Sequence, residues 1–201
     1  MNNMKNIAVY CGSNLGESPA FYQAAQDMGK TIAERGSRLV YGGGKVGLMG
    51  TVADAVLAHG GEVIGVIPTF LREKEVAHQA LTELIETADM TERKTKMITL
   101  SDAFIAMPGG IGTYEELFEV LSLSQLRLHA KPIGILNIEG FFNPLISLMQ
   151  QTAAQGFMPK ANLGLLCVAD NPSDLLAQMT AYEFVDVLKW VQPGWQKQKV
   201  V

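Results

Sequence analysis

Cysteine is scarce in this sequence, with Cys11 and Cys167 as the two residues of that type among 201. They lie far apart and form no C-x-x-C pair, so neither a disulfide framework nor a cysteine-rich zinc site is expected. Long apolar runs are also missing, because segment 7–10 is too short for a signal-peptide core and no later run approaches a membrane span. We therefore expect a soluble, cytoplasmic protein with no membrane partner.

An excess of positive charge is absent too. The formal net charge is −4 and the isoelectric point is near 5.4, which argues against a broad surface for nucleic acids. The histidines His59, His78 and His129 show no spacing typical of a zinc site, and we expect them at helix ends or on the surface. No G-x-S-x-G elbow supports a serine hydrolase. The expected partner is a small molecule, with neither a metal nor a cofactor.

Apolar and polar segments alternate in a regular order along the chain. Short apolar runs ending in glycine or proline predict strands, and periodic segments between them predict helices. The expected strands are 6–10, 38–41, 63–67, 84–87, 103–107, 132–136 and 165–169, and the expected helices are 19–35, 47–59, 90–100, one around 117–124, 142–155 and 173–182. The polar segment 72–75 is expected as a loop or short helix.

This alternation predicts an α/β fold with a doubly wound, mostly parallel sheet and helices on both faces, a Rossmann-like arrangement. A length of 201 residues with 48% hydrophobic content suits one domain over 1–201, with an irregular tail from about residue 190. Ligands of such folds bind beyond the carboxyl ends of the strands. The turns 12–13, 42–44 and 108–113 are therefore expected near one crevice.

The most informative segment is 108–116, which reads Pro-Gly-Gly-Ile-Gly-Thr-Tyr-Glu-Glu. It lies between an expected buried strand and an expected helix, so its glycines occupy a strand-to-helix turn. Main-chain N–H groups converge there at the positive end of the helix, and glycine lets the backbone approach a phosphate. The segment therefore predicts an anion cradle about one helical turn from the carboxylate of Glu116, which points to hydrolysis at a nucleotide.

A second glycine turn, 42–47, matches G-x-G-x-x-G by spacing. It follows the second expected strand and has no convincing acidic ribose partner, so it indicates a dinucleotide site only weakly. Lys45 is followed by Val46 where a Walker A loop needs a hydroxyl residue for magnesium, which disfavours that motif as well. A turn that permits tight packing of strand and helix explains the same residues.

Simpler structural roles are open for the other candidates. Thr113 and Glu116 have the T-x-x-E spacing of a helix capping box, which requires no catalysis. Considered alone, Arg93 and Lys94 would form a solvated basic helix face, and Glu115 fits a surface or support role. Five methionines are expected in core packing: Met28, Met49, Met90, Met97 and Met107.

Two segments together resemble a known family. The chain resembles the LOG, or "lonely guy", phosphoribohydrolases in their paired signature, which corresponds here to 89–97 (Asp-Met-Thr-Glu-Arg-Lys-Thr-Lys-Met) and 108–116. The resemblance extends from Val9 to about Gly156. Members of that family cleave the N-glycosidic bond of nucleoside 5′-monophosphates to a free base and ribose 5-phosphate, and many act on cytokinin ribotides. The resemblance implies this reaction here, on adenosine 5′-monophosphates that include N6-substituted ones.

The resemblance also implies site residues. Arg93 and Glu116 match the catalytic pair, and we expect Glu116 to stabilise charge on the ribose and activate water while Arg93 positions the nucleotide. The main-chain N–H groups of 110–113 are expected to hold the 5′-phosphate. The expected substrate-binding residues are Ser13, Gly43, Gly44, Glu75, Lys94, Gly109, Gly110, Ile111, Gly112, Thr113 and Ser122.

Some questions stay open at this stage. Thr91 stands where plant members often have histidine, and Ser122 where many have threonine, so the preferred base is not determined. A non-catalytic nucleotide sensor would keep the cradle with less need for Glu116, and an amino-acid decarboxylase, the older label of similar proteins, would require a lysine-linked pyridoxal phosphate. The resemblance further implies a homodimer in which the helix over 115–126 contributes to the interface or completes the pocket.

Overall fold

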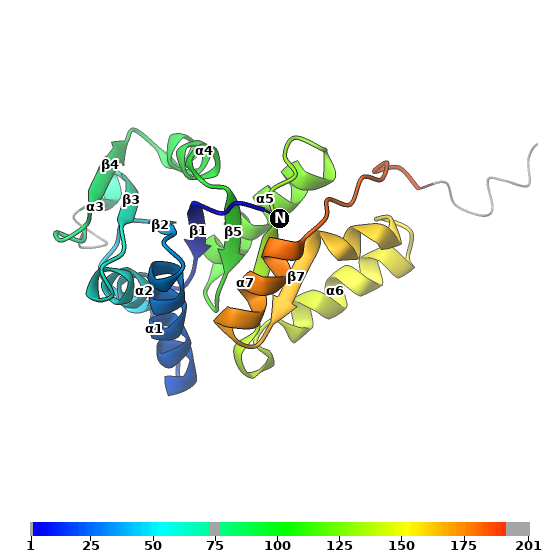
Figure 1. Ribbon diagram of the computed structural model, residues 1–201. Helices are drawn as coiled ribbons and strands as arrows, with labels where there is room; N and C mark the ends of the chain where they lie inside the picture. Colours follow the sequence, from blue (N-terminus) through cyan, green and yellow to red (C-terminus); the bar gives the residue numbers. More distant parts are fainter. Residues whose placement is uncertain (1, 73–76, 192–201) are drawn as a thin grey trace, which may run out of the picture.

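Parallel strands form the central sheet of the protein, which a computed structural model describes for residues 2–72 and 77–191 (Figure 1). The strands are β1 (Asn6–Tyr10), β2 (Arg38–Tyr41), β3 (Val63–Pro68), β4 (Glu83–Thr87), β5 (Ala103–Ala106), β6 (Ile133–Leu136) and β7 (Leu166–Ala169). Their order is β4-β3-β2-β1-β5-β6-β7, and every pair of neighbours runs parallel. The expected doubly wound sheet is confirmed, and its named strands are entirely parallel.

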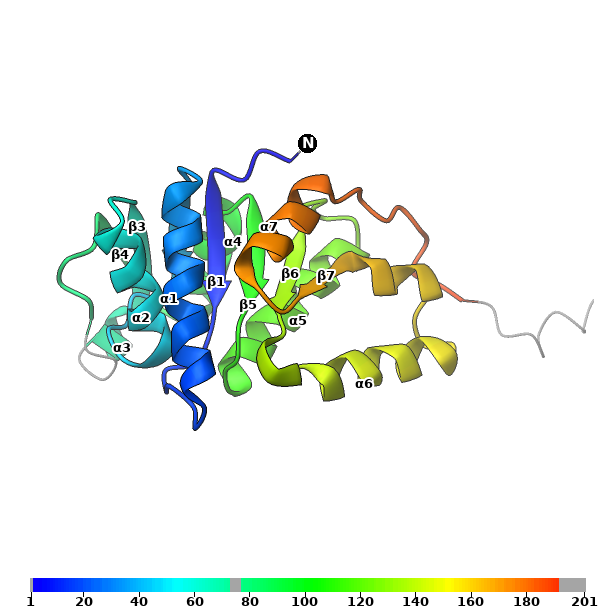
Figure 2. The ribbon, with the colours of Figure 1, turned by 60° about the horizontal axis from the view of Figure 1, so that its bottom comes forward.

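Helices connect the strands and cover both faces of the sheet. The α-helices are α1 (Pro19–Glu34), α2 (Gly47–Ala58), α3 (Thr69–Arg72), α4 (Met90–Leu100), α5 (Ile111–Gln125), α6 (Asn143–Ala154) and α7 (Pro172–Ala181), and the 3₁₀ turns are η1 (Ile138–Gly140) and η2 (Lys160–Leu165). Figure 2 shows α1 and α7 in front of the strands and α4 and α5 behind them.

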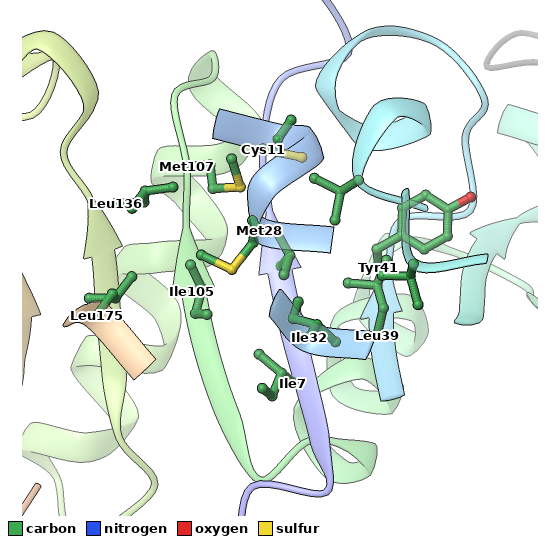
Figure 3. Close-up of a cluster of buried hydrophobic side chains, with 14 of the residues drawn as sticks. Ile7, Cys11, Met28, Ile32, Leu39, Tyr41, Ile105, Met107, Leu136 and Leu175 are labelled. Carbon is green, nitrogen blue, oxygen red and sulfur yellow. The ribbon is translucent and has the colours of Figure 1, made fainter. Parts of the chain in front are cut away.

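The strands divide their side chains between two apolar cores. Ile7 and Val9 of β1 join a cluster with α1, α2 and α7, whereas Ala8 and Tyr10 join a cluster with α4, α5 and α6. This division follows because successive side chains of a strand point to opposite faces. Figure 3 shows the first cluster, in which Met28 of α1 packs among strand side chains.

Local sequence sets where several helices begin. The Ser18 hydroxyl accepts a hydrogen bond from a first-turn N–H of α1 at 3.2 Å, and Pro19 occupies a first-turn position that needs no N–H. The pair Asn171-Pro172 repeats this arrangement at the start of α7. Such caps satisfy backbone donors that have no partner inside the helix.

Every expected strand and helix is present, with ends within one residue of the expected ones where both were assigned. The turns η1 and η2 were not expected. Helix α3 ends at Arg72, so part of the expected segment 72–75 lies outside the described residues, as does 192–201 of the expected tail. Within the described residues, no helix combines the length and apolar character needed to cross a bilayer.

The sheet has a topological switch point between β1 and β5. Strands β2 to β4 extend to one side of β1, and β5 to β7 extend to the other. Backbone hydrogen bonds join the ends of the two central strands, from Met107 N–H to the Tyr10 carbonyl at 2.9 Å and from Gly12 N–H to the Pro108 carbonyl at 3.0 Å. Ligands of doubly wound folds bind in the crevice at this point.

Candidate active site

Two adjoining cavities open at this switch point, each of about 270 Å³. They share Gly12, Ser13 and Gly110, so two of the three expected turns, 12–13 and 108–113, border one crevice, whereas the third, 42–44, lines neither cavity. The first, which we call the Phe21 cavity, has mainly apolar walls that include Phe21 and Phe141. The second, which we call the Arg93 cleft, contains both residues of the expected catalytic pair.

Helix α5 begins beside the Arg93 cleft without a side-chain cap. Gly110 occupies the N-cap position with no side-chain hydrogen bond, and the helix starts at Ile111. The first-turn N–H groups therefore lie at the positive end of the helix, where anions are favoured. Because Thr113 is the third residue of the helix and not its cap, the capping-box interpretation of Thr113 and Glu116 is wrong.

The turn before α5 packs tightly against its surroundings. A Cβ at Gly109 would lie 2.2 Å from the hydroxyl oxygen of buried Thr113 and 2.8 Å from the Gly12 nitrogen, so only glycine fits there. At Gly110 and Gly112, by contrast, a Cβ would meet no atom within 4 Å. The turn is thus fixed from behind and open toward the cleft.

Side chains cap the start of α4 in an arrangement similar to a capping box. Asp89 Oδ1 accepts from the Glu92 N–H at 2.8 Å, and Glu92 Oε2 accepts from the Ala88 N–H at 2.7 Å. This reciprocal arrangement satisfies backbone donors at the helix start. It sets the first turn of α4, so that Arg93 follows directly after it.

Arg93 is only 5% exposed and lies on the buried face of α4. Its Nη2 donates to the Gly42 carbonyl at 3.3 Å, and its Nη1 lies 3.6 Å from the Met90 sulfur. Its buried Nε–H has no hydrogen-bond acceptor within the described part of the chain. A buried donor without an acceptor costs about 1–3 kcal/mol. Because the Nε–H of Arg93 is buried without an acceptor, binding of a ligand that supplies a hydrogen-bond acceptor is favoured.

The turn after β2 provides the space for this guanidinium. A Cβ at Gly42 would lie 2.1 Å from Nη2 of Arg93. Gly43 and Gly44 line neither cavity; the Gly43 carbonyl accepts from the His78 N–H at 3.0 Å, and Gly44 forms an isolated bridge. The glycine turn thus leaves space for the guanidinium of Arg93 and accepts its hydrogen bond, a role that the sequence did not indicate.

Glu116 lies on α5 one turn beyond Gly112 and lines the Arg93 cleft in a half-buried position. Burial raises the pKa of the Cys11 thiol, and the charge of Glu116 adds to the effect. Burial likewise raises the pKa of Tyr10, with Glu116 as the next cause. Both groups stay protonated near neutral pH, so the thiol and the phenol near Glu116 and Arg93 add no charge to the cleft.

The remaining expected site residues fall into three groups. Lys94 pairs with Glu115 and Glu119 of α5 and lines neither cavity, and Ser122 borders a separate cavity of about 150 Å³ farther along α5. Glu75 lies outside the described residues. Those that border the crevice near Arg93 and Glu116 are Ser13, Gly109, Gly110, Ile111, Gly112 and Thr113.

Three apolar residues of the Arg93 cleft were missed by the sequence analysis: Met49, Leu71 and Met90. Met90 was expected in the core but is half-buried at the cleft. Its spacing could have revealed this, because a residue three positions before Arg93 lies on the same helix face. The other expected core methionines are buried: Met28, Met49, Met97 and Met107.

The expectation of exposed or helix-end histidines is wrong at His78, which is 2% exposed. Its Nδ1 accepts from the Ala80 N–H at 3.1 Å, so the neutral ring carries its proton on Nε2 and donates to Asp54 at 2.8 Å. This histidine joins the segment before β4 to α2. Across the described residues, no group of three or more His, Cys, Asp or Glu side chains could hold a metal ion.

Comparison with known proteins shows the family of this chain. The sequence model of a family described as "Possible lysine decarboxylase" matches residues 49–179. A cytokinin riboside 5′-monophosphate phosphoribohydrolase of Arabidopsis thaliana is 40% identical over 98% of this chain and 91% of its own length. The enzyme of the same name designated LOG, from Oryza sativa subsp. japonica, is 42% identical over 89% of this chain and 74% of its own. The chain belongs to the LOG family.

The LOG family fold also resembles solved structures of other proteins. A Moco carrier protein from Chlamydomonas reinhardtii has a TM-score of 0.69 and 22% identity, covering 90% of this chain and 98% of that one. At this level of identity the likeness concerns the fold alone.

The side chains of the cleft do not support the decarboxylase description. Enzymes that use pyridoxal phosphate bind it through a lysine. Among the described residues, no lysine lines either cavity, and Lys94 is paired with two carboxylates.

Proposed function

We propose that this LOG family protein hydrolyses the N-glycosidic bond of adenosine 5′-monophosphates, N6-substituted ones included, to a free base and ribose 5-phosphate. The names of the relatives, at 40% and 42% identity over most of the chain, support the reaction. The observation that carries the proposal is the presence of Arg93 and Glu116 in one cleft beside the uncapped start of α5. The reaction uses no cofactor.

In this proposal the 5′-phosphate binds at the start of α5. The first-turn N–H groups and the helix dipole attract the anion, and Gly110 and Gly112 leave open space for it. Hydrogen bonds to charged groups contribute roughly 1.5–3 kcal/mol each. Two of them account for a preference of about a hundredfold or more for monophosphates over nucleosides.

Cleavage builds positive charge on the anomeric carbon of the ribose. The Glu116 carboxylate stabilises this charge and takes a proton from water, whose oxygen bonds to that carbon as the carbon–nitrogen bond breaks. The electron pair of the broken bond goes to the base nitrogen, which takes up a proton from solvent as the base leaves, and Glu116 returns its proton to solvent. Arg93, held by its hydrogen bond to Gly42, positions the nucleotide and assists the departure of the base.

The base packs on the apolar wall of the cleft. Met49, Leu71 and Met90 supply this wall next to Arg93. Sulfur contacts with an aromatic ring contribute about 0.3–1.5 kcal/mol each, which suits a flat purine.

We also propose that the protein is a cytoplasmic homodimer. Phe118, Leu148 and Phe157 on or next to α5 and α6 are 42%, 58% and 85% exposed, and a second copy would shield them from water. Ser122 borders a cavity together with Phe118 and would then approach the second copy. Cys11 and Cys167 are both buried free thiols, which suits a reducing compartment.

Release of free base tests the proposed reaction. Purified protein is incubated with AMP, isopentenyl-AMP and adenosine, and the products are separated by chromatography. We expect base from the monophosphates and about a hundredfold less from adenosine. Binding of AMP without release would contradict the proposal and indicate a nucleotide sensor.

Variants test the assignment of the catalytic pair. Glu116→Gln and Arg93→Ala should each lower base release by about a hundredfold or more. Glu34→Gln removes an exposed carboxylate of α1 and serves as the matched control. Unchanged turnover in both site variants would reject the assignment even if the wild-type protein releases base.

A further inference from the structure

Each helix that supplies a charged group to the Arg93 cleft carries a second charged residue beside it. Lys94 follows Arg93 on α4, and Glu115 precedes Glu116 on α5. The Lys94 ammonium pairs with Glu115 and also with Glu119, at 3.2 Å from Oε2 of the latter. One ammonium therefore links α4 to two carboxylates of α5. We call these three residues the Lys94 clamp.

The geometry of α5 permits this double contact. Glu115 and Glu119 are four residues apart, so their side chains lie one turn apart on the same helix face. The Lys94 side chain is 19% exposed, against 49% for Glu115 and 34% for Glu119. The hydrogen bond to Glu115 raises the pKa of Lys94, which keeps the ammonium charged near neutral pH.

The Lys94 clamp lies beside the reacting groups. Consecutive residues of an α-helix are about 100° apart around its axis. Arg93 therefore reaches Gly42 and the cleft while Lys94 reaches α5. Glu115 borders the edge of the cleft, and Glu116 lines it from the next position. The clamp thus joins the two helices that carry Arg93 and Glu116.

We propose that Lys94 is a positioning residue, which through Glu115 and Glu119 holds α4 against α5 so that Arg93 and Glu116 have the separation that hydrolysis requires. The inference rests on the proposed function. It assigns Lys94 a task other than the nucleotide contact that the family resemblance implied, and it agrees with the position of Lys94 outside the cavity linings.

The expected effect is on rate more than on stability. Surface ion pairs contribute about 0–1 kcal/mol to stability. A misplacement of about 1 Å at a reacting centre, however, costs about a hundredfold in rate. The Lys94 side chain is 19% exposed and pairs with two carboxylates, so the clamp is not an isolated surface pair. Its loss acts on the geometry between two catalytic groups.

The two tasks predict different kinetics. Loss of a phosphate ligand that binds ground state and transition state equally raises KM and leaves kcat unchanged, whereas loss of a positioning residue lowers kcat. The carboxylates of Glu115 and Glu119 separate the tasks further, because they repel phosphate. If Lys94 binds phosphate, removal of the two carboxylates should make phosphate bind more tightly. If Lys94 is a positioning residue, their removal should lower kcat.

The experiment compares variants of the full-length protein with AMP as substrate. Lys94→Met and the double variant Glu115→Gln/Glu119→Gln should each lower kcat by about tenfold or more, with KM within about threefold of wild type. The triple variant should be no slower than either, because all three residues act as one unit. Lys94→Arg should restore most of kcat, and Lys96→Met, an exposed lysine of the same helix, should match wild type.

Two kinetic results would overturn the inference: a raised KM with unchanged kcat in Lys94→Met, or tighter AMP binding in the double carboxylate variant. Wild-type kinetics in Lys94→Met would also overturn it. A readout independent of turnover is the NMR signal of the Arg93 Nε–H, assigned with Arg93→Lys. It should shift in Lys94→Met and not in Lys96→Met. If wild-type protein releases no base, the proposed function fails, and the NMR comparison still decides whether Lys94 positions Arg93.

Discussion

The guanidinium of Arg93 donates a hydrogen bond to the carbonyl oxygen of Gly42 across 3.3 Å, although the two residues are 51 positions apart in the chain. A Cβ at position 42 would lie 2.1 Å from the donating nitrogen. The contact therefore depends on a residue without a side chain. The proposed catalytic arginine is held by the backbone of a turn that sequence patterns associate with phosphates.

Gly42→Ala should displace this guanidinium. Because the added methyl group meets the end of a side chain, we expect the protein to fold and base release to fall by about a hundredfold. Turnover of AMP and urea unfolding measure the two effects. Gly164→Ala is the control, since its Cβ would meet only a side-chain carbon at 3.3 Å. Normal turnover in a folded Gly42→Ala protein would show that hydrolysis does not require the guanidinium of Arg93 to lie beside Gly42.

Alanine at Gly109 and alanine at Gly112 should have different effects, the first on stability and the second on AMP binding. Gly109→Ala should lower the free energy of unfolding by roughly 1–3 kcal/mol, because its Cβ would overlap the Thr113 hydroxyl. Gly112→Ala lies in α5 in open space and should keep or slightly raise stability, while its methyl group enters the proposed phosphate site. Urea unfolding and calorimetric AMP titration report the two quantities. Full AMP affinity in Gly112→Ala would place the phosphate elsewhere.

The strands and helices could be predicted because their signals are local. Segment 103–107 is a short apolar run followed by glycines, and such runs alternate with helical periodicity along the chain. Parallel topology then predicts that the turns 12–13 and 108–113 meet, since both follow central strands. This reasoning also led to the crevice at the switch point.

The roles of individual side chains depend on where each helix starts and which way it faces. Both Asp89–Glu92 and Thr113–Glu116 have capping spacing, but α5 starts at Ile111 and leaves the second pair inside the helix. Helix orientation likewise brings Lys94 to α5 and Ser122 to another cavity, so their expected substrate contacts stay predictions. Such details come from packing between elements, which spacing along one segment does not encode.

His129 predicts a dependence of stability on pH. Its Nε2 donates to the Val120 carbonyl at 3.0 Å, and its Nδ1 accepts from the Lys131 N–H at 3.2 Å. Burial lowers the pKa of His129 from its ordinary 6.5, so the unfolded chain binds the proton first as pH falls. The contribution of neutral His129 to the free energy of unfolding is fully present above about pH 6.5 and is lost as pH falls through the folded-state pKa. Urea unfolding at pH 7.5 and 5.5 should show a smaller loss for His129→Gln than for wild type, and equal losses would contradict this.

Phe118 tests the proposed homodimer. Phe118→Glu should place a charge in the interface and convert the dimer to a monomer, which light scattering after size-exclusion chromatography would measure. Tyr22→Glu, at a 43% exposed position on α1, is the matched control and should leave the dimer intact. A monomeric wild-type protein, or a dimeric Phe118→Glu variant, would count against this interface.

The turns after β1 and β5 are joined main chain to main chain, through Gly12 and Pro108, and the start of α5 offers amides in place of side chains. A substitution other than proline does not remove a main-chain N–H, as it would remove a side-chain ligand. In the proposed function, replacement of Met49, Leu71 or Met90 in the apolar wall of the Arg93 cleft would therefore alter which bases fit while the proposed phosphate site is kept. The residues that would select the base are then different from the groups that would hold the phosphate, so the wall can be redesigned while the phosphate site is kept.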